Sequence, residues 1–344
     1  MFTNTLLNFT LGSRIGSGGE ATVYKAIDTQ LNAEIVIKKI PKSNFTDIDK
    51  YFEESQKLYL SSHHNVVKVM YGCQDNDFIY LAMPLYPKGS LKSIIDNKFL
   101  TSREIIRYSL QFLSGLNFIH SKQLIHYDIK PENILIDNTN TASISDFGLA
   151  EYLGFYGFAN IRGTTKEFAP PELFSQPAHN IKFDIYQSGL TLFRMCNGDD
   201  IFFQQLDESF TSKGVTNDGI FINNLIREKF PIRNYFLPHI PKGIIQVIRK
   251  ALKADPNERY DSVLEMLNDL SKINNSDDWV YSKTTNIEKW EKQKYLVTCT
   301  YNDTNNKYTI VALKNNRRKK DYCLTLDTQK QAYDLLYDCL NNTW

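Results

Sequence analysis

Residues 126–133 read His-Tyr-Asp-Ile-Lys-Pro-Glu-Asn, and Asp146-Phe147-Gly148 begins thirteen positions after the last of them. The first segment offers a carboxylate (Asp128), an ammonium (Lys130) and an amide (Asn133) at fixed offsets, and the second adds another carboxylate. Phosphoryl transfer needs such groups, because it uses a base for the incoming hydroxyl, a cation for the migrating phosphoryl group and oxygen ligands for magnesium. Short motifs also occur by chance, so the interpretation depends on further motifs in the right order.

A glycine-rich segment near the start of the chain supplies one of them. Residues 16–23 read Gly-Ser-Gly-Gly-Glu-Ala-Thr-Val and follow a strand-like run at 11–15. Glycine lets backbone amides approach phosphate oxygens closely and bend over them. Lys38 then ends the β-branched run 35–37, which is typical of a strand. The segment therefore indicates a nucleotide phosphate site.

In this order the motifs resemble those of the eukaryotic-type serine/threonine protein kinases. Residues 162–172 resemble the family's Gly-Thr…Ala-Pro-Glu segment, residues 184–189 resemble its Asp-x-Trp-x-x-Gly, and Arg259 would be the buried partner of Glu172. The resemblance covers about residues 8–273. It implies an α+β bilobal fold, whose parts are a β-rich N-terminal lobe (about 8–83), a hinge (84–86) and an α-helical C-terminal lobe (87–273).

The resemblance also implies roles for single residues. Asp128 would accept the substrate hydroxyl proton or orient the hydroxyl, and Lys130 would neutralise the transferring phosphoryl group. Asn133 and Asp146 would hold Mg²⁺, for which Mn²⁺ is a possible substitute. One threonine would bridge the catalytic Asp and Lys: counting from Gly163 gives Thr164, and counting back from Glu172 gives Thr165.

A second set of residues would bind ATP. Lys38 would contact the α- and β-phosphates and pair with a helix glutamate. Glu54 is the expected partner and Glu53 the competitor, because neighbours on a helix point about 100° apart and only one can face the lysine. Since Pro84 has no N–H, the backbone donor to adenine would come from the two residues after it. The other expected ATP contacts are Gly16, Ser17, Gly18, Val23, the gatekeeper Met83, Leu85 and Tyr86.

One departure from the family pattern bears on regulation. Tyr127 stands where the family usually has an arginine that binds a phosphorylated activation loop through bidentate contacts. Tyrosine cannot supply that charge, so we expect activity that does not depend on activation-loop phosphorylation. The segment 149–169 should then be held by its own packing. The aromatic residues expected to provide it are Tyr152, Phe155, Tyr156 and Phe158.

Composition limits the other classes of function. Of 344 residues, 42% are hydrophobic and 23% charged, and the formal net charge is +1, so nucleic acid is not expected as the main partner. The five cysteines are scattered without ligand spacing, which favours a reducing compartment and argues against a zinc site or disulfide framework. The chain shows no secretory signal and no apolar run of about 18 residues. We expect a soluble, cytoplasmic protein.

The tail differs from the rest. Residues 274–290 read as a polar linker, and residues 291–344 as a small β-β-β-α module with strands at 295–301, 307–313 and 322–326 and a helix at 328–340. The module is expected either to bind a partner or to pack on the preceding domain. Its basic run at 317–320 is most simply a solvated turn, and a phosphate- or partner-binding role is the alternative.

Two other functions compete with a protein kinase. A pseudokinase scaffold would be expected to lack Lys38, Asp128, Asn133 or Asp146, and all four are present. A small-molecule phosphotransferase of kinase-like fold would typically lack the Pro-Glu after the activation segment and the Asp184 motif. The protein substrate cannot be read from the sequence.

Overall fold

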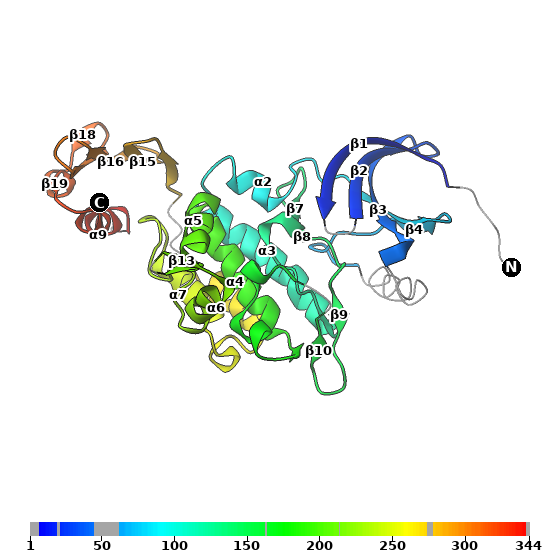
Figure 1. Ribbon diagram of the computed structural model, residues 1–344. Helices are drawn as coiled ribbons and strands as arrows, with labels where there is room; N and C mark the ends of the chain where they lie inside the picture. Colours follow the sequence, from blue (N-terminus) through cyan, green and yellow to red (C-terminus); the bar gives the residue numbers. More distant parts are fainter. Residues whose placement is uncertain are drawn as a thin grey trace. The chain divides into compact units, whose positions relative to one another are not determined.

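The computed structural model describes residues 7–18, 21–44, 62–161, 164–212, 214–273 and 278–341 (Figure 1). Its contacts divide the chain into two compact units. The N-terminal unit comprises Met1–Gly89 and Leu135–Ser145, and the C-terminal unit comprises Ser90–Ile134 and Asp146–Trp344. Each is considered separately below.

The N-terminal unit is built on a five-stranded antiparallel sheet in the order β1-β2-β3-β5-β4. Its small core gathers Ala26, Ile35, Ile37 and Ala82, as expected from the β-branched run on the third strand. The predicted strands at the start of the chain are therefore confirmed. The bounds are β1 (Phe9–Gly18), β2 (Ala21–Asp28), β3 (Ala33–Pro41), β4 (Tyr71–Gln74) and β5 (Phe78–Pro84).

Two details of this unit differ from expectation. The largely apolar run at 66–71 favours a strand, but strand β4 starts only at Tyr71, because Val67 instead donates its N–H to the Ile144 carbonyl (2.8 Å). The unit also ends at Gly89 rather than at residue 83, since the Gly89 carbonyl accepts a hydrogen bond from Ile136 N (2.8 Å). The charged stretch from about residue 46 to 60, whose sequence favours a helix, lies outside the described residues.

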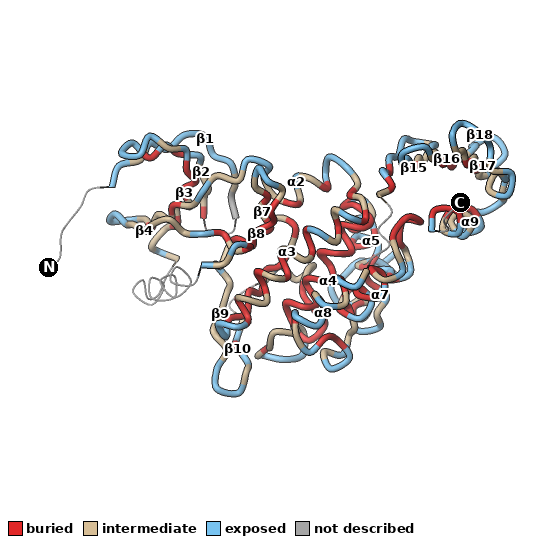
Figure 2. The backbone as a smooth tube through the Cα atoms, turned by 180° about the vertical axis from the view of Figure 1, so that it is seen from behind, coloured by how far each residue is buried: buried red, intermediate tan, exposed pale blue. Residues whose placement is uncertain are grey.

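Helices dominate the C-terminal unit, as expected for the second lobe. The longest, α3 (Ser102–Ser121), starts with the capping box of Thr101 and Glu104. Helix α4 (Lys182–Asn197) is the central element, because nearly all of its residues are buried (Figure 2). The other helices of the lobe are α2 (Leu91–Ile95), α5 (Asp199–Ser209), α6 (Asp218–Ile226), α7 (Lys242–Ala251) and α8 (Val263–Ser271).

The described residues also form short paired strands and 3-10 turns. The strand pairs are β6 (Leu124–Ile125) with β9 (Glu151–Tyr152), β7 (Ile134–Ile136) with β8 (Ala142–Ile144), β10 (Ala159–Asn160) with β11 (Ala178–His179), and β12 (Thr211–Ser212) with β13 (Val215–Thr216). The 3-10 turns are η1 (Lys42–Asn44), η2 (Pro131–Asn133), η3 (Lys166–Phe168), η4 (Pro171–Phe174), η5 (Pro256–Glu258) and η6 (Lys320–Tyr322).

The C-terminal module holds more strands than predicted. Two of them, β14 (Val280–Lys283) and β15 (Ile287–Lys292), lie in the segment expected to be a linker, because its aromatic residues Trp279, Tyr281 and Trp290 are buried. The module comprises β14, β15, β16 (Tyr295–Asn302), β17 (Lys307–Lys314), β18 (Arg317–Arg318), β19 (Thr325–Leu326) and α9 (Gln329–Asn341). Of the strand expected at 322–326 only the end forms, but the capping box of Thr328 and Gln331 is present.

The module packs on the helical lobe, which was one of the two expectations for it. Trp290 Nε1 donates to His239 Nδ1 (3.1 Å) in a buried contact, and Asn341 Nδ2 donates to the Pro238 carbonyl (2.9 Å). The Tyr281 ring meets Phe99 edge-on, with centroids 4.5 Å apart. The His239 ring stacks on the Tyr281 ring, and burial lowers the pKa of His239 to about 4.

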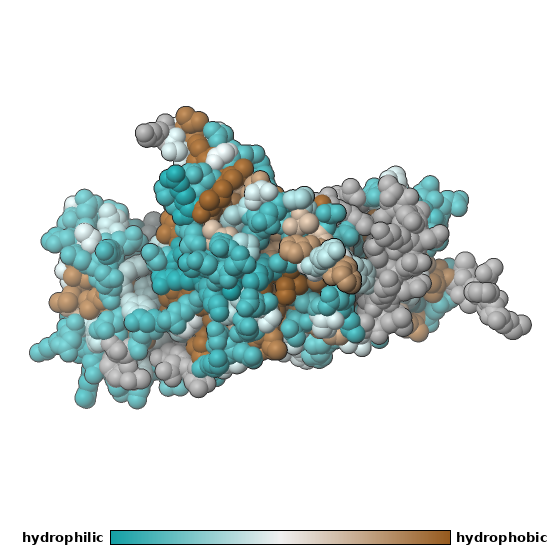
Figure 3. Space-filling model, turned by 90° about the horizontal axis from the view of Figure 1, so that it is seen from below, coloured by the Kyte–Doolittle hydropathy of each residue, from teal (hydrophilic) through white to brown (hydrophobic). Residues whose placement is uncertain are grey.

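The surface shown in Figure 3 is mostly hydrophilic, with hydrophobic side chains scattered among the polar ones. None of the helices in the described ranges is long and apolar enough to cross a membrane.

Candidate active site

Side chains of helix α4 hold the backbone of the segment 126–133 through hydrogen bonds. Asp184, fully buried, accepts hydrogen bonds at Oδ2 from His126 N and at Oδ1 from Tyr127 N, both at 2.8 Å. Its Oδ2 also lies 2.8 Å from His120 Nε2 on α3. Hydrogen bonds to a charged acceptor are stronger than neutral ones, so this carboxylate holds the loop backbone firmly.

Two further side chains of α4 continue the same support. Gln187 accepts from Ile129 N (3.0 Å) and donates to the Tyr127 carbonyl (3.0 Å), while the Thr191 hydroxyl donates to the Ile129 carbonyl (3.4 Å). Positions 184, 187 and 191 share one helix face. Sequence reasoning found the aspartate and missed the other two residues, although their three- and four-residue spacing was a usable signal.

Asp128 lies between the two partners that the sequence predicted. Its Oδ1 is 2.8 Å from Lys130 Nζ, and its Oδ2 accepts from Asn133 Nδ2 at 2.7 Å. Asn133 Nδ2 also donates to the Asp128 carbonyl (2.9 Å), so the amide is oriented and its Oδ1 is the atom suited to a metal. Three of the predicted catalytic and metal residues therefore meet at one point.

Asp146 has an unusual backbone. Its φ of 63° lies in the left-handed region, as does that of Tyr127 (63°), and such values are uncommon for residues other than glycine. Gly148 N donates to Asp146 Oδ1 (3.3 Å), and the Phe147 ring meets the His126 ring with centroids 5.1 Å apart. Sparsely populated conformations of this kind cluster at functional sites, which agrees with the role predicted for Asp146.

The donor set fits magnesium. Asn133 and Asp146 offer an amide and a carboxylate oxygen, the hard ligands that Mg²⁺ prefers. Within the described ranges no three His, Cys, Asp or Glu side chains gather as a metal cage.

The predicted nucleotide residues lie in the N-terminal unit. Lys38 is on β3, opposite Val23 on β2 and Leu81 on β5. Gly16 pairs with Val23, and Met83 pairs with Val36 near the end of β5. Ser17 and Gly18 end β1.

The residues expected to form the hinge begin at Pro84, the last residue of β5. Leu85 and Tyr86 are half-buried, and burial raises the pKa of Tyr86. Glu53 and Glu54 lie outside the described residues, so the choice between them stays a prediction.

Comparison with known proteins decides the family. The family model for the protein kinase domain matches residues 9–270, which is most of the chain. The chain belongs to the protein kinase family.

Several curated relatives of this kinase domain come from bacteria. A probable serine/threonine-protein kinase of Clostridium acetobutylicum is 26% identical over 276 residues, covering 78% of this chain and 40% of that protein. The serine/threonine-protein kinase PrkC of Bacillus subtilis is 29% identical over 262 residues, covering 74% of this chain and 39% of that protein. The aligned part thus spans about two fifths of the length of these relatives.

The two threonine candidates of the kinase are distinguished by their contacts. Thr164 Oγ1 donates to the Tyr127 carbonyl (3.2 Å), which places this hydroxyl against the catalytic loop. Thr165 is exposed. The geometry therefore favours Thr164.

Tyr127 is the residue that joins the catalytic loop to the activation segment. It is 0% exposed, and its hydroxyl donates to the Ala159 carbonyl (2.8 Å) on β10. Its ring meets Phe183 edge-on, with centroids 5.0 Å apart, in a buried cluster that includes Ile125 and Ala169. Burial, followed by the negative charges of Asp184 and Glu151, raises the pKa of Tyr127, so the hydroxyl stays a donor.

Of the four aromatic residues expected to pack the activation segment, Tyr152 is half-buried on β9, but the other three are exposed. Phe155 is 99% exposed, Tyr156 87% and Phe158 47%. They lie in the turn between β9 and β10, which closes where Gly154 N donates to the Phe158 carbonyl (2.9 Å). For these three the expectation was wrong because Tyr127 already fills the interior beneath the segment.

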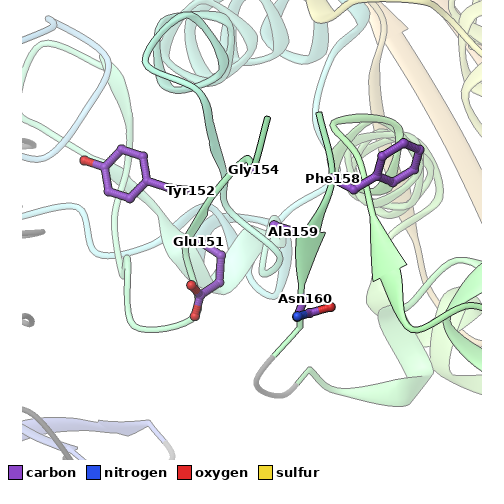
Figure 4. A pocket seen from close by; sticks show the side chains of 6 residues that line it. All are labelled: Glu151, Tyr152, Gly154, Phe158, Ala159 and Asn160. Atoms are coloured by element: carbon purple, nitrogen blue, oxygen red, sulfur yellow. The ribbon is translucent and has the colours of Figure 1, made fainter. Parts of the chain in front are cut away.

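A shallow pocket of about 380 Å³ lies along this hairpin, lined by Glu151, Tyr152, Gly154, Phe158, Ala159 and Asn160. Figure 4 shows the Tyr152 and Phe158 rings pointing away from each other, so they do not form a wall for a ligand.

Two buried arginines form ion pairs within the helical lobe. Arg259 makes the predicted bidentate pair with Glu172, both contacts at 2.7 Å. Arg194, 0% exposed, was missed: it binds Glu132 of the catalytic loop (2.7 and 2.9 Å) and Asp199 (2.7 and 2.8 Å). Nothing in the local sequence indicated this contact, because Glu132 and Arg194 are far apart in the chain.

Proposed function

We propose that this kinase transfers the γ-phosphoryl group of ATP to serine and threonine hydroxyls of proteins. The observation that carries the proposal is the Asp128 carboxylate held between Lys130 and Asn133, on a loop fixed by Asp184. The Asp-x-Lys-Pro-Glu-Asn form and the names of the relatives favour serine and threonine. The substrate proteins are not identified by this chemistry.

Each residue then has a distinct task. Asp128 orients the substrate hydroxyl and accepts its proton, and its neighbour Lys130 meets the charge of the transferring group. Asn133 and Asp146 hold Mg²⁺, which when bound neutralises charge on the phosphate oxygens. Thr164 secures the activation segment to the catalytic loop.

Lys38 orients the α- and β-phosphates. Since the adenine contacts supply much of the affinity for ATP, Lys38→Met should lower turnover more than it lowers ATP binding. Measuring kcat together with the Kd of ATP separates the two effects, and an equal loss in both would count against this role.

We also propose that activity does not require a phosphorylated activation segment. Tyr127 supports this, because its buried hydroxyl and ring hold the segment by neutral contacts in the position where an arginine would receive a phosphate. Protein treated with a phosphatase should keep most of its initial rate. A rate that collapses after treatment and recovers when the loop is phosphorylated again would contradict the proposal.

The deciding experiment is incubation with γ-labelled ATP and Mg²⁺ against a panel of proteins and small metabolites. Label in protein, on serine or threonine after acid hydrolysis, is expected, and Asp128→Asn should remove it. Nucleotide binding without label transfer would indicate a pseudokinase scaffold. Label only in small molecules would indicate a small-molecule phosphotransferase.

We further propose a reducing, cytoplasmic setting. All five cysteines are free, and burial raises the pKa of the Cys196 and Cys299 thiols, which keeps them protonated and unreactive.

A further inference from the structure

The C-terminal module carries a compact group of basic side chains at one end of its sheet (strands β15 to β18; Figure 1). Lys292, Tyr295, Lys314 and Arg317 are paired in register across four neighbouring strands. Residues directly opposite one another in a sheet share a face, so these four side chains form one row. With strands about 4.8 Å apart, the row is roughly 15 Å long. Together with Lys294 in the β15–β16 turn, it is called the Tyr295 cluster below.

Tight turns fix the row. Asn315 and Asn316 both have left-handed backbones (φ 49° and 60°), as in the two-residue hairpin turns that Asn favours. This turn sets Arg317 directly opposite Lys314. Like charges placed opposite each other in a sheet are unfavourable, so an anion bound between them would relieve a repulsion that the fold imposes.

The positive charges converge on one ring. The ammonium of Lys314 lies 5.1 Å from the Tyr295 ring centroid, and those of Lys292 and Lys294 both lie 5.9 Å from it. A hydrogen bond from Lys314, then the charges of Lys314, Lys294 and Lys292, lower the pKa of Tyr295 against a smaller opposing effect of burial. The local potential around the tyrosine is therefore positive.

Three other lysines of the module have acidic partners. Lys289 lies 2.8 Å from Glu291, Lys307 lies 3.1 Å from Asp327, and Lys283 lies 3.9 Å from Glu288. Among the ion pairs of the described residues none involves Lys294, Lys314 or Arg317. Lys314 and Arg317 therefore present two directly opposed positive charges, and the basic run continues along the chain through Arg318, Lys319 and Lys320.

We propose that the Tyr295 cluster binds a phosphorylated serine or threonine of a protein. A phosphomonoester brings about −1.5 to −2 charges and three acceptor oxygens, which suit the two directly opposed cations Lys314 and Arg317. The formal net charge of +1 favours a single phosphate group over an extended polyanion such as RNA or an anionic membrane, although the basic run extends to Lys320.

The choice of a protein-borne phosphate rests on the proposed function, because phosphoproteins are the product of such a kinase. The module is held to the helical lobe through Trp290 and His239, so a bound phosphoprotein would be kept on the same compact unit as the catalytic loop. The cluster would then retain substrates that already carry one phosphate.

The test is fluorescence anisotropy of the full chain with a degenerate peptide library that carries a central phosphoserine, compared with the same library carrying serine. No ATP is present, so the result does not depend on whether the chain is an active kinase. We expect the phosphorylated library to bind at least tenfold more tightly, and inorganic phosphate at millimolar concentration to compete.

Variants locate the site. Lys314→Gln combined with Arg317→Gln should lower affinity for the phosphorylated library at least tenfold, whereas the matched pair Lys289→Gln and Lys307→Gln, on the same sheet, should leave it unchanged. Equal unfolding midpoints show that the variants fold. Arg317→Gln alone, at an exposed residue, replaces the double variant if that one is unstable, and should still weaken binding severalfold.

Three results would overturn the proposal: no preference for phosphoserine, an unchanged affinity in the folded Lys314 and Arg317 variants, or tighter binding of single-stranded RNA or phosphatidylserine vesicles through the same residues. The last would assign the cluster to a different macromolecule.

Discussion

The catalytic loop and the activation segment of this kinase are held in place by different kinds of contact. The loop at 126–133 depends on buried charge, since Asp184 accepts from two of its backbone N–H groups and Arg194 binds its Glu132. The segment at 151–160 depends on Tyr127, a neutral side chain that packs and donates one hydrogen bond. Ionic contacts therefore position the catalytic loop. The activation segment, in contrast, meets a neutral tyrosine at position 127, where the family usually has an arginine.

The largest effect should follow from removing the carboxylate that the loop presents. Asp128→Asn keeps the size of the side chain but removes the base, so turnover should fall by roughly 10²–10⁴-fold. The unfolding midpoint should change little. Asp200→Asn, on an exposed position of α5, is the matched control and should keep wild-type turnover. Wild-type turnover in Asp128→Asn would refute the assignment.

Removing the Asp184 charge, which holds the catalytic loop, should have the next largest effect on activity. Asp184→Asn replaces a carboxylate that accepts from His126 N and Tyr127 N with a neutral amide, and each hydrogen bond to a charged group contributes about 1.5–3 kcal/mol. We expect destabilisation of that order and a fall in kcat of tenfold or more, with KM for ATP less affected. Denaturant unfolding and steady-state kinetics measure the two, and Asp207→Asn on α5 is the control. A stable, fully active Asp184→Asn would show that the ionic support is dispensable.

Acid should destabilise the folded protein at the strand that pairs with the activation segment. His179 on β11 pairs with Ala159, and among the described residues neither of its ring nitrogens has a hydrogen-bond partner. Burial lowers its pKa, against an opposing effect of Glu172, so the folded state prefers the neutral ring. Its contribution to stability is present above the ordinary histidine pKa and is lost as pH falls below it.

The stability of the wild type should therefore fall from about pH 6.5 downward, with a contribution from this histidine of at most about 1.4 kcal/mol per pH unit. His179→Phe, which can pack on Phe183, should lack that contribution. Unfolding by denaturant at pH 7.5, 6.5 and 5.5 measures the difference between the two proteins. Parallel curves for both would rule out His179 as the source.

Contacts between residues close in sequence could be predicted, whereas contacts between distant residues could not. Asp128, Lys130 and Asn133 were predictable because their partners lie within a few residues, so spacing alone sets their geometry. Arg194 was not, because its contact with Glu132 joins residues that only the packing of α4 brings together. The strands around Trp290 were missed because polar residues surround the aromatic ones, and burial depends on the helical lobe that covers them.

The activation segment shows a different limit. Hydrophobicity correctly marked Phe155 and Tyr156 as unusual, but it could not show whether interior space was available for them. Tyr127 occupies that space. A sequence pattern states how much apolar surface a segment has, whereas its burial depends on competition with side chains far away in the chain.

A conservative substitution at Tyr127 should measure how much its hydroxyl stabilises the docked activation segment. Tyr127→Phe keeps the ring in its cluster and removes the hydrogen bond to the Ala159 carbonyl, so the folded state should lose about 1 kcal/mol. Turnover should fall a few-fold, and phosphatase treatment should still have no effect. Tyr156→Phe makes the same chemical change at an exposed position and is the control. If both variants behaved alike, the buried hydroxyl would have no role in docking the segment.

The smallest effect is expected at the tip of the hairpin. Phe155 and Tyr156 contact each other edge-on with centroids 5.3 Å apart, but both are almost fully exposed. Phe155→Ser combined with Tyr156→Ser should therefore change the free energy of unfolding by no more than about 0.5 kcal/mol, as for ordinary surface substitutions. Turnover on short peptides should also be unchanged, because the segment is docked through Tyr127 and Ala159. A loss well above 1 kcal/mol in denaturant unfolding would show that the tip packs inward in solution, and the contrast between an ionic loop and a segment docked by neutral contacts would no longer hold.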